Sequence, residues 1–243
     1  PLSCPDNVSS LRQSILLILN TAVTYGRMVV IVGMGLSFSA IMYRTLGVAD
    51  FGLWNGMVVG ASIALMLTDG LSNAADRFLA FALGRGDRAR LRQVSTGLIG
   101  VFALIAAATV AISLPLGSLV IAQSSLGLDR VEPAWWAFAF SVGYVAVQML
   151  WSPVRCLFNA HPDVIPLTIV EMIDAALRLG AVVAALALPF DLLQAVSLTI
   201  MLASLTTLVF ASVWCFWRYP DARPSPRAWS GTVLREMARF STW

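Results

Sequence analysis

Long apolar runs, separated by short polar segments, dominate the pattern of this chain. Each run reaches or exceeds the ~20 residues that a helix needs to cross ~30 Å of hydrocarbon. A bilayer interior admits only backbone whose polar groups are satisfied internally, so the runs are predicted to be helices. The six predicted spans cover residues 15–42, 51–71, 94–121, 134–158, 164–188 and 193–217.

The segments between the runs carry glycine, proline and aspartate, which favour turns. The predicted breaks are residues 45–50, 84–87, 127–129, 161–163 and 189–191. The composition, 58% hydrophobic and 12% charged, is more apolar than a water-soluble domain of 243 residues can bury. The predicted fold class is therefore all-α and integral to the membrane, a bundle of six transmembrane helices.

The basic residues predict how the bundle is oriented. All 16 are arginines, and with a cytoplasmic N-terminus twelve of them lie at the cytoplasmic side of the spans. Arg44 and Arg130 fall on the opposite side, and Arg27 and Arg178 lie within spans. This asymmetry follows the positive-inside rule. The net positive charge of +3 indicates contact with anionic membrane lipids rather than nucleic acid, because the arginines flank spans and form no separate basic domain.

Polar residues within the first two spans are the first candidates for a binding site. A charge at the bilayer centre costs about 2.5–3.5 kcal/mol on insertion scales and usually faces a cavity or a partner. Asn20, Thr24 and Arg27 are spaced to share one face of the first helix. Asp69 continues a polar stripe on the second helix, although its place near the cytoplasmic end is equally consistent with simple solvation.

The fourth and fifth spans carry further polar stripes. Gln148 and Arg155 belong to the stripe on the fourth helix, and Glu171, Asp174 and Arg178 lie on the fifth. Asp174 and Arg178, four residues apart, can pair directly. We expect the first, second, fourth and fifth helices to surround a polar cavity, with the third and sixth facing mostly lipid. The alternatives are a stripe that only packs helices together and a purely structural Asp174–Arg178 pair.

No motif for catalysis or metal binding is present in the sequence. It lacks a Gly-x-Ser-x-Gly elbow, a His-Glu-x-x-His pair and a phosphate-binding Gly-rich loop. Cys4, Cys156 and Cys215 have no spacing typical of a zinc site. We expect a protein that is not an enzyme, with no catalytic residues, no metal and no cofactor.

Four segments of the sequence are similar to those of a known transporter family. Residues 43–54 contain the pattern Arg-x-Leu-Gly-x-x-x-Phe-Gly-x-Trp at the first break. Residues 68–71 read Thr-Asp-Gly-Leu, residues 82–87 form an Ala-Leu-Gly-Arg-Gly-Asp loop, and residues 234–241 look like the lead-in to a seventh helix. On these residues the chain resembles the Wzx-like polysaccharide and O-antigen flippases of the multidrug/oligosaccharidyl-lipid/polysaccharide (MOP) exporter superfamily.

The resemblance implies the N-terminal half of a two-lobed transporter. Residues 1–217 would form its six-helix lobe, and residues 218–243 would be an arginine-rich cytoplasmic linker to a second lobe. Such proteins export undecaprenyl-diphosphate-linked saccharides, precursors of lipopolysaccharide or exopolysaccharide, across the bacterial cytoplasmic (inner) membrane by alternating access. The predicted substrate-binding residues are Asn20, Thr24, Arg27, Asp69, Gln148, Arg155 and Arg178.

Glu171 and Asp174 resemble in position the acidic residues that bind a coupling cation, H⁺ or Na⁺, in related drug exporters. A cation-coupled multidrug antiporter of the same fold is therefore the alternative function. Arginines in the cavity favour the flippase, because a pump for organic cations would avoid positive charge there. A scaffold without transport activity is a third hypothesis, and the charged stripes within the spans argue against it.

Overall fold

The computed structural model describes residues 7–123, 128–161, 164–189 and 191–224, with the side chains of residues 7–24, 61, 64, 67, 128, 129 and 164 left out. Its helices are α1 (Asn7–Gly84), α2 (Arg88–Gln123), α3 (Leu128–Ala160), α4 (Val164–Ala185), α5 (Leu192–Arg218) and the short 3-10 turn η1 (Pro220–Ala222).

Gly47 divides α1 into two helical segments. Its backbone has φ 76° and ψ 176°, a conformation that is open to glycine and strained for residues with a Cβ. We call residues 7–46 the first arm and residues 48–84 the second arm. The break at residues 45–50 is thereby confirmed, and the six predicted spans fall on six separate helical segments, although α4 ends at Ala185, three residues before the predicted end of its span.

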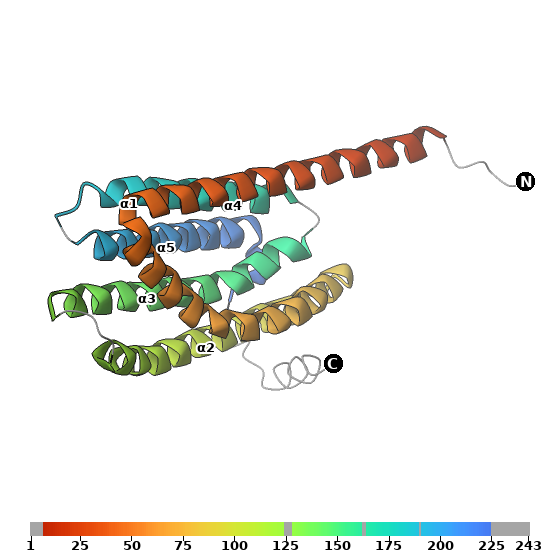
Figure 1. The fold of residues 1–243 in the computed structure, drawn as a ribbon. Helices are drawn as coiled ribbons and strands as arrows, with labels where there is room; N and C mark the ends of the chain where they lie inside the picture. The colour runs from red at the N-terminus through yellow and green to blue at the C-terminus, as the bar shows by residue number, and fades with distance from the viewer. Residues whose placement is uncertain (1–6, 124–127, 162–163, 190, 225–243) are drawn as a thin grey trace, which may run out of the picture.

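The helical segments alternate in direction, so that their connections gather at two ends (Figure 1). At one end, Arg88 Nε lies 3.4 Å from Asp221 Oδ2, and Ser95 Oγ donates a hydrogen bond of 2.8 Å to the Ala222 carbonyl. At the other end, Arg130 Nη1 lies 2.8 Å from Asp50 Oδ1. The loops after the second and sixth predicted spans, where arginines are frequent, therefore meet at the same end. We call it the inner end.

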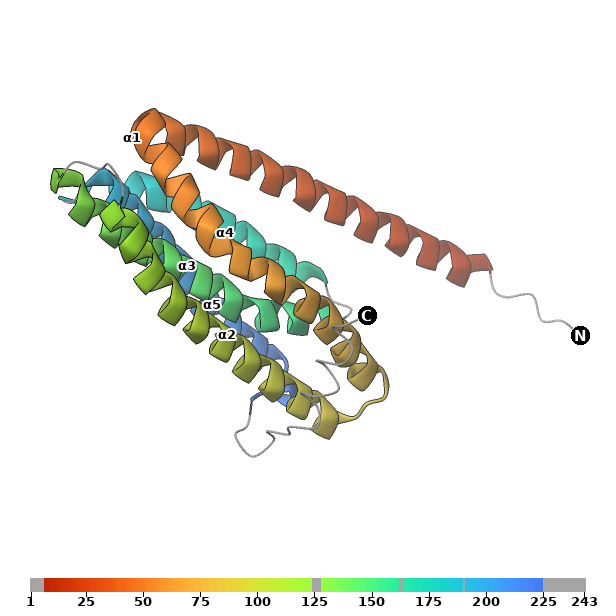
Figure 2. The same cartoon turned by 60° about the horizontal axis from the view of Figure 1, so that its bottom comes forward.

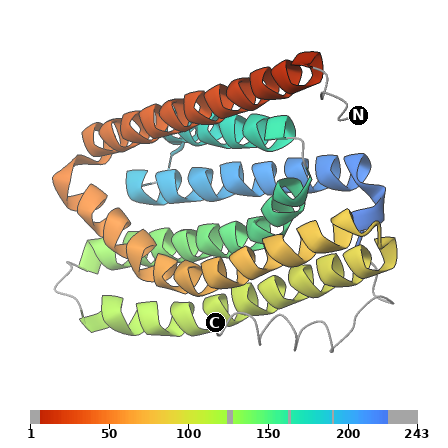
Figure 3. The same ribbon diagram turned by 90° about the vertical axis from the view of Figure 1, so that its right-hand side faces the viewer.

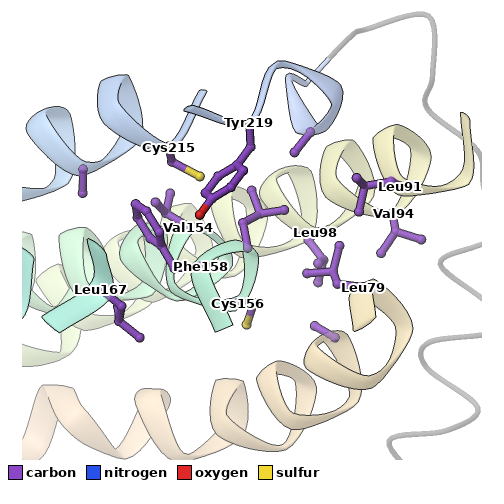
Figure 4. Close-up of a cluster of buried hydrophobic side chains, with 14 of the residues drawn as sticks. Leu79, Leu91, Val94, Leu98, Val154, Cys156, Phe158, Leu167, Cys215 and Tyr219 are labelled. Carbon is purple, nitrogen blue, oxygen red and sulfur yellow. The ribbon is translucent and has the colours of Figure 1, made fainter. Parts of the chain in front are cut away.

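A dry apolar core holds the inner end together (Figure 4). Leu79 from the second arm, Leu98 from α2, Phe158 from α3 and Cys215 from α5 are all at least 99% buried within it. The Phe158 ring also contacts the rings of Trp214 and Tyr219 at centroid distances of 6.3 and 6.2 Å. Leu167 and Val170 add α4 to the same cluster, so burial of this apolar surface fixes the second arm, α2, α3, α4 and α5 against one another.

The first arm is attached differently. It lies beside α4 at one side of the bundle (Figure 3) and diverges from the other helices toward its N-terminal end (Figure 2). The helix α3 bends in its C-terminal part, where Pro153 removes one backbone donor (Figure 3). These two features leave space between the first arm, α3 and α4.

Four helical stretches among the described residues are long and apolar enough to cross a membrane: Tyr25–Gly60, Arg88–Gln123, Arg130–Ala160 and Leu192–Arg218. The first of these includes Gly47, so it draws on both arms. The residues that the structure describes form an all-helical fold, with the long apolar helices of a multi-pass membrane protein. That all six segments cross the bilayer stays a prediction, since α4 is interrupted by three charged residues.

Candidate functional site

A cavity of about 610 Å³ lies between the first arm, α4 and the end of α3. Its two walls differ in chemistry. The first arm contributes mainly apolar groups, among them Met28, Ile31 and Phe38, whereas α4 contributes three charged residues. The residues that line it are Arg27, Met28, Ile31, Val32, Met34, Gly35, Phe38, Arg155, Glu171, Asp174, Ala175 and Arg178.

One ion-pair group crosses the cavity between three helices. Arg27 Nη2 of the first arm lies 3.1 Å from Glu171 Oε2 of α4, and both side chains are about one-fifth exposed. Arg155 Nε of α3 lies 3.9 Å from the other oxygen of the same carboxylate, and 55% of its side chain is exposed. Glu171 is thus shared by two arginines, and Arg155 is the more loosely held.

A second ion-pair group lies within α4. Arg178 Nη2 is 2.6 Å from Asp174 Oδ2, one helical turn away. Arg178 Nη1 also donates a hydrogen bond of 2.8 Å to the Tyr144 hydroxyl of α3, and its Cζ lies 5.3 Å from the centre of the Tyr144 ring. These contacts fix the Arg178 guanidinium at the edge of the cavity. The pairing of Asp174 with Arg178 that the spacing predicted is present.

The carboxylates of α4 also reach a small polar space of about 20 Å³ between α3, α4 and α5. Gln148 Nε2 of α3 lies there, 3.4 Å from Ser204 Oγ of α5. Ser204 and Thr207 of the sixth span are 2% and 4% exposed, because these two side chains point into the bundle beside Glu171 and Asp174. The other face of α5 carries exposed apolar side chains, among them Leu205, Val209 and Val213.

The structure brings together Arg27, Arg155, Glu171, Asp174 and Arg178 from the predicted site, with Gln148 close behind them. Asp69 does not join them. Its side chain is exposed and it is not among the residues that line the cavity. The side chains of Asn20 and Thr24 lie outside the described residues, so their predicted role stays a prediction.

Two features of the site were not predicted from the sequence. Tyr144 belongs to the polar stripe of the fourth span, but nothing in the spacing pairs it with Arg178. The Arg27–Glu171 contact joins residues from the first and fifth spans. Charge complementarity between two spans is the signal that could have suggested it, but the same rule would also have allowed Arg27 to pair with Asp174.

The charges in this cavity suit an anion that carries several oxygen atoms. Three guanidinium groups face two carboxylates, which leaves a net charge of about +1 when all five are ionised. Guanidinium presents a planar fork of donors that fits phosphate and carboxylate oxygens. The apolar wall of the first arm offers a hydrocarbon surface beside these charges. The cavity therefore offers guanidinium groups to the head group of an anionic amphiphile and an apolar wall to its hydrocarbon part.

One solved structure is similar to this chain in fold. It is described as the inward-facing conformation of a multidrug resistance MATE family transporter of the MOP superfamily, and the TM-score is 0.67. The two chains are 16% identical, and the match covers 84% of this chain and 47% of the other. The chain therefore spans about half the length of that transporter and shares the fold of the matched half. Neither the protein-family models nor the curated proteins include a match to this chain.

Proposed function

We propose that this chain is the N-terminal lobe of an exporter that moves lipid-linked saccharides across the bacterial cytoplasmic membrane by alternating access. The cavity between the first arm and α4 would hold the diphosphate head group, with Arg27, Arg155 and Arg178 as its cationic partners. The cargo class is an undecaprenyl-diphosphate-linked oligosaccharide or polysaccharide precursor. In this proposal residues 1–217 form the lobe, and residues 218–243 lead to a second lobe.

The observation that supports this proposal most is the excess of arginine in a cavity with one apolar wall. A diphosphate carries at least two negative charges, and three arginines within reach of one another can neutralise them. Tyr144 holds one of these arginines in place through its hydroxyl. The similarity of the fold to a MATE transporter fits transport by a rocking lobe.

A cation-coupled multidrug antiporter is the second candidate. The similar solved structure is described as a multidrug resistance transporter, and Glu171 and Asp174 are carboxylates in the same cavity. In either function they are the proposed sites for a coupling H⁺ or Na⁺. An antiporter for organic cations needs carboxylates that its cargo can reach, whereas here each carboxylate already faces an arginine. This pairing favours the anionic cargo.

The test is a complementation assay with the full-length protein in cells that lack it. We expect Arg27→Ala to abolish surface polysaccharide while membrane insertion is retained, because the first arm then offers no cation to the head group. Arg44→Ala is the matched control, since Arg44 is exposed at the opposite end from the inner-end loops. Normal surface polymer with a stable Arg27→Ala protein would contradict the proposal.

A parallel assay separates the two candidates. A proton or sodium gradient is imposed across inverted vesicles that contain the full-length protein. The uptake of a fluorescent organic cation into the vesicles is then measured. The flippase predicts no gradient-driven uptake. Uptake that depends on Glu171 and Asp174 would favour the antiporter.

A further inference from the structure

Glu171 holds a position between two arginines that an oxyanion of the cargo could take. Its Oε2 is 3.1 Å from Arg27 Nη2, and its Oε1 is 3.9 Å from Arg155 Nε. A carboxylate that turns one oxygen to each of two guanidinium groups presents two anionic acceptors, as one edge of a phosphate group does. With the cavity free of cargo, this side chain supplies the anion that both arginines require.

The contacts of the other acidic residue are of a different kind. Asp174 pairs with Arg178 inside the same helix, and Arg178 is held in addition by Tyr144. Arg178 Nη1 and Nη2 are therefore held by partners on α3 and α4, and only its buried Nε is without a hydrogen-bond partner among the described residues. Glu171 instead belongs to α4, while its two partners belong to the first arm and α3. If its side chain swings away, Arg27 and Arg155 are left facing a common space in the cavity.

We propose that Glu171 is a resident counter-ion, which a phosphate group of the cargo displaces from Arg27 and Arg155. The inference rests on the proposed function and states how the head group is received. Two guanidinium groups near each other in a partly exposed cavity repel, so an internal anion between them is stabilising. The same anion competes with the cargo and lowers its affinity. Once displaced, Glu171 becomes the carboxylate that a coupling cation can reach.

The test measures the dissociation constant of inorganic pyrophosphate for the purified full-length protein at fixed ionic strength. Glu171→Gln removes the competing charge and keeps the size of the side chain, so we expect binding about tenfold tighter than in the wild type, a difference of 1.4 kcal/mol. Glu132→Gln is the matched control, because Glu132 is exposed on α3 and is not among the residues that line the cavity. Its affinity for pyrophosphate should equal that of the wild type.

Two further variants make the result specific. Glu171→Asp keeps the negative charge, so it should bind pyrophosphate no more tightly than the wild type and should melt at a higher temperature than Glu171→Gln. Arg27→Gln should weaken binding. Unchanged or weaker binding in Glu171→Gln, with Arg27→Gln still weakening it, would overturn the counter-ion role and leave the proposed function standing. No binding in the wild type or in Glu171→Gln would overturn both.

A competition experiment identifies the source of the phosphate. Undecaprenyl diphosphate in phosphatidylcholine nanodiscs should displace pyrophosphate, and more readily from Glu171→Gln than from the wild type. Displacement supports a lipid head group as the ligand. Retained pyrophosphate binding at saturating lipid would overturn the lipid source in favour of a free oxyanion.

Discussion

The inner-end core and the cavity beside the first arm are held together by opposite means. In the core, Leu79, Leu98 and Phe158 pack from three helices and are almost fully buried. At the cavity, Glu171 of α4 joins Arg27 of the first arm and Arg155 of α3 through side chains that are 18–55% exposed. Near Gly47 the first arm is held by apolar contacts instead, since Met42 and Leu46 belong to a buried cluster with residues of α3, α4 and α5. Packed apolar surfaces resist small displacements, whereas partly hydrated ion pairs can exchange partners. The core is therefore suited to keep the second arm and α2 to α5 rigid, and the cavity is suited to open and close.

The largest effect on stability should come from the core. We expect Phe158→Ala to lower the free energy of unfolding of the purified protein by about 3–5 kcal/mol, because the change removes a ring that is 1% exposed and leaves a void. Phe210→Ala on α5 is the matched control, since Phe210 is 44% exposed. Denaturation followed by circular dichroism measures both. Equal losses in the two variants would show that the inner end does not act as a packed unit.

The second ion-pair group should give a smaller effect that depends on its partner. Arg178→Ala leaves the Asp174 charge partly buried without its cation, so it should destabilise the protein more than the double variant Arg178→Ala/Asp174→Asn does. We expect a coupling free energy of about 1–2 kcal/mol from the double-mutant cycle. Additive changes in the free energy of unfolding would rule out a paired role for these residues.

How much could be predicted from the sequence depended on whether the signal for each feature was local in the chain. The helices were predictable because hydropathy and turn residues act locally. Gly47 shows this best, since its positive φ lies inside a predicted break. The charges of α4 were identified as a site because a charge in an apolar run is costly wherever it lies. These inferences needed no knowledge of which helices are neighbours.

The contacts within the site could not be predicted, because they depend on which helices lie next to one another. Asp69 was one candidate for the cavity because it continues a polar stripe, in which Asn55, Ser62 and Asp69 follow at intervals of seven residues, but the second arm does not line that cavity. A seven-residue spacing also drifts by about 20° per repeat around a straight helix, which weakens the inference of one face. The Arg27–Glu171 contact and the burial of Ser204 likewise follow from helix neighbours that are far apart in the chain.

The central claim is that water and cargo enter the space between the first arm and α4. Single cysteines at Ala175 and Leu177, in a protein whose Cys4, Cys156 and Cys215 are replaced by alanine, test it with a thiol reagent that cannot cross the membrane. Ala175 lines the cavity, and Leu177 lies at nearly the same depth on α4 without lining it. The account predicts that Ala175→Cys reacts and that Leu177→Cys does not. Reaction of Leu177→Cys alone, or of neither, would contradict it.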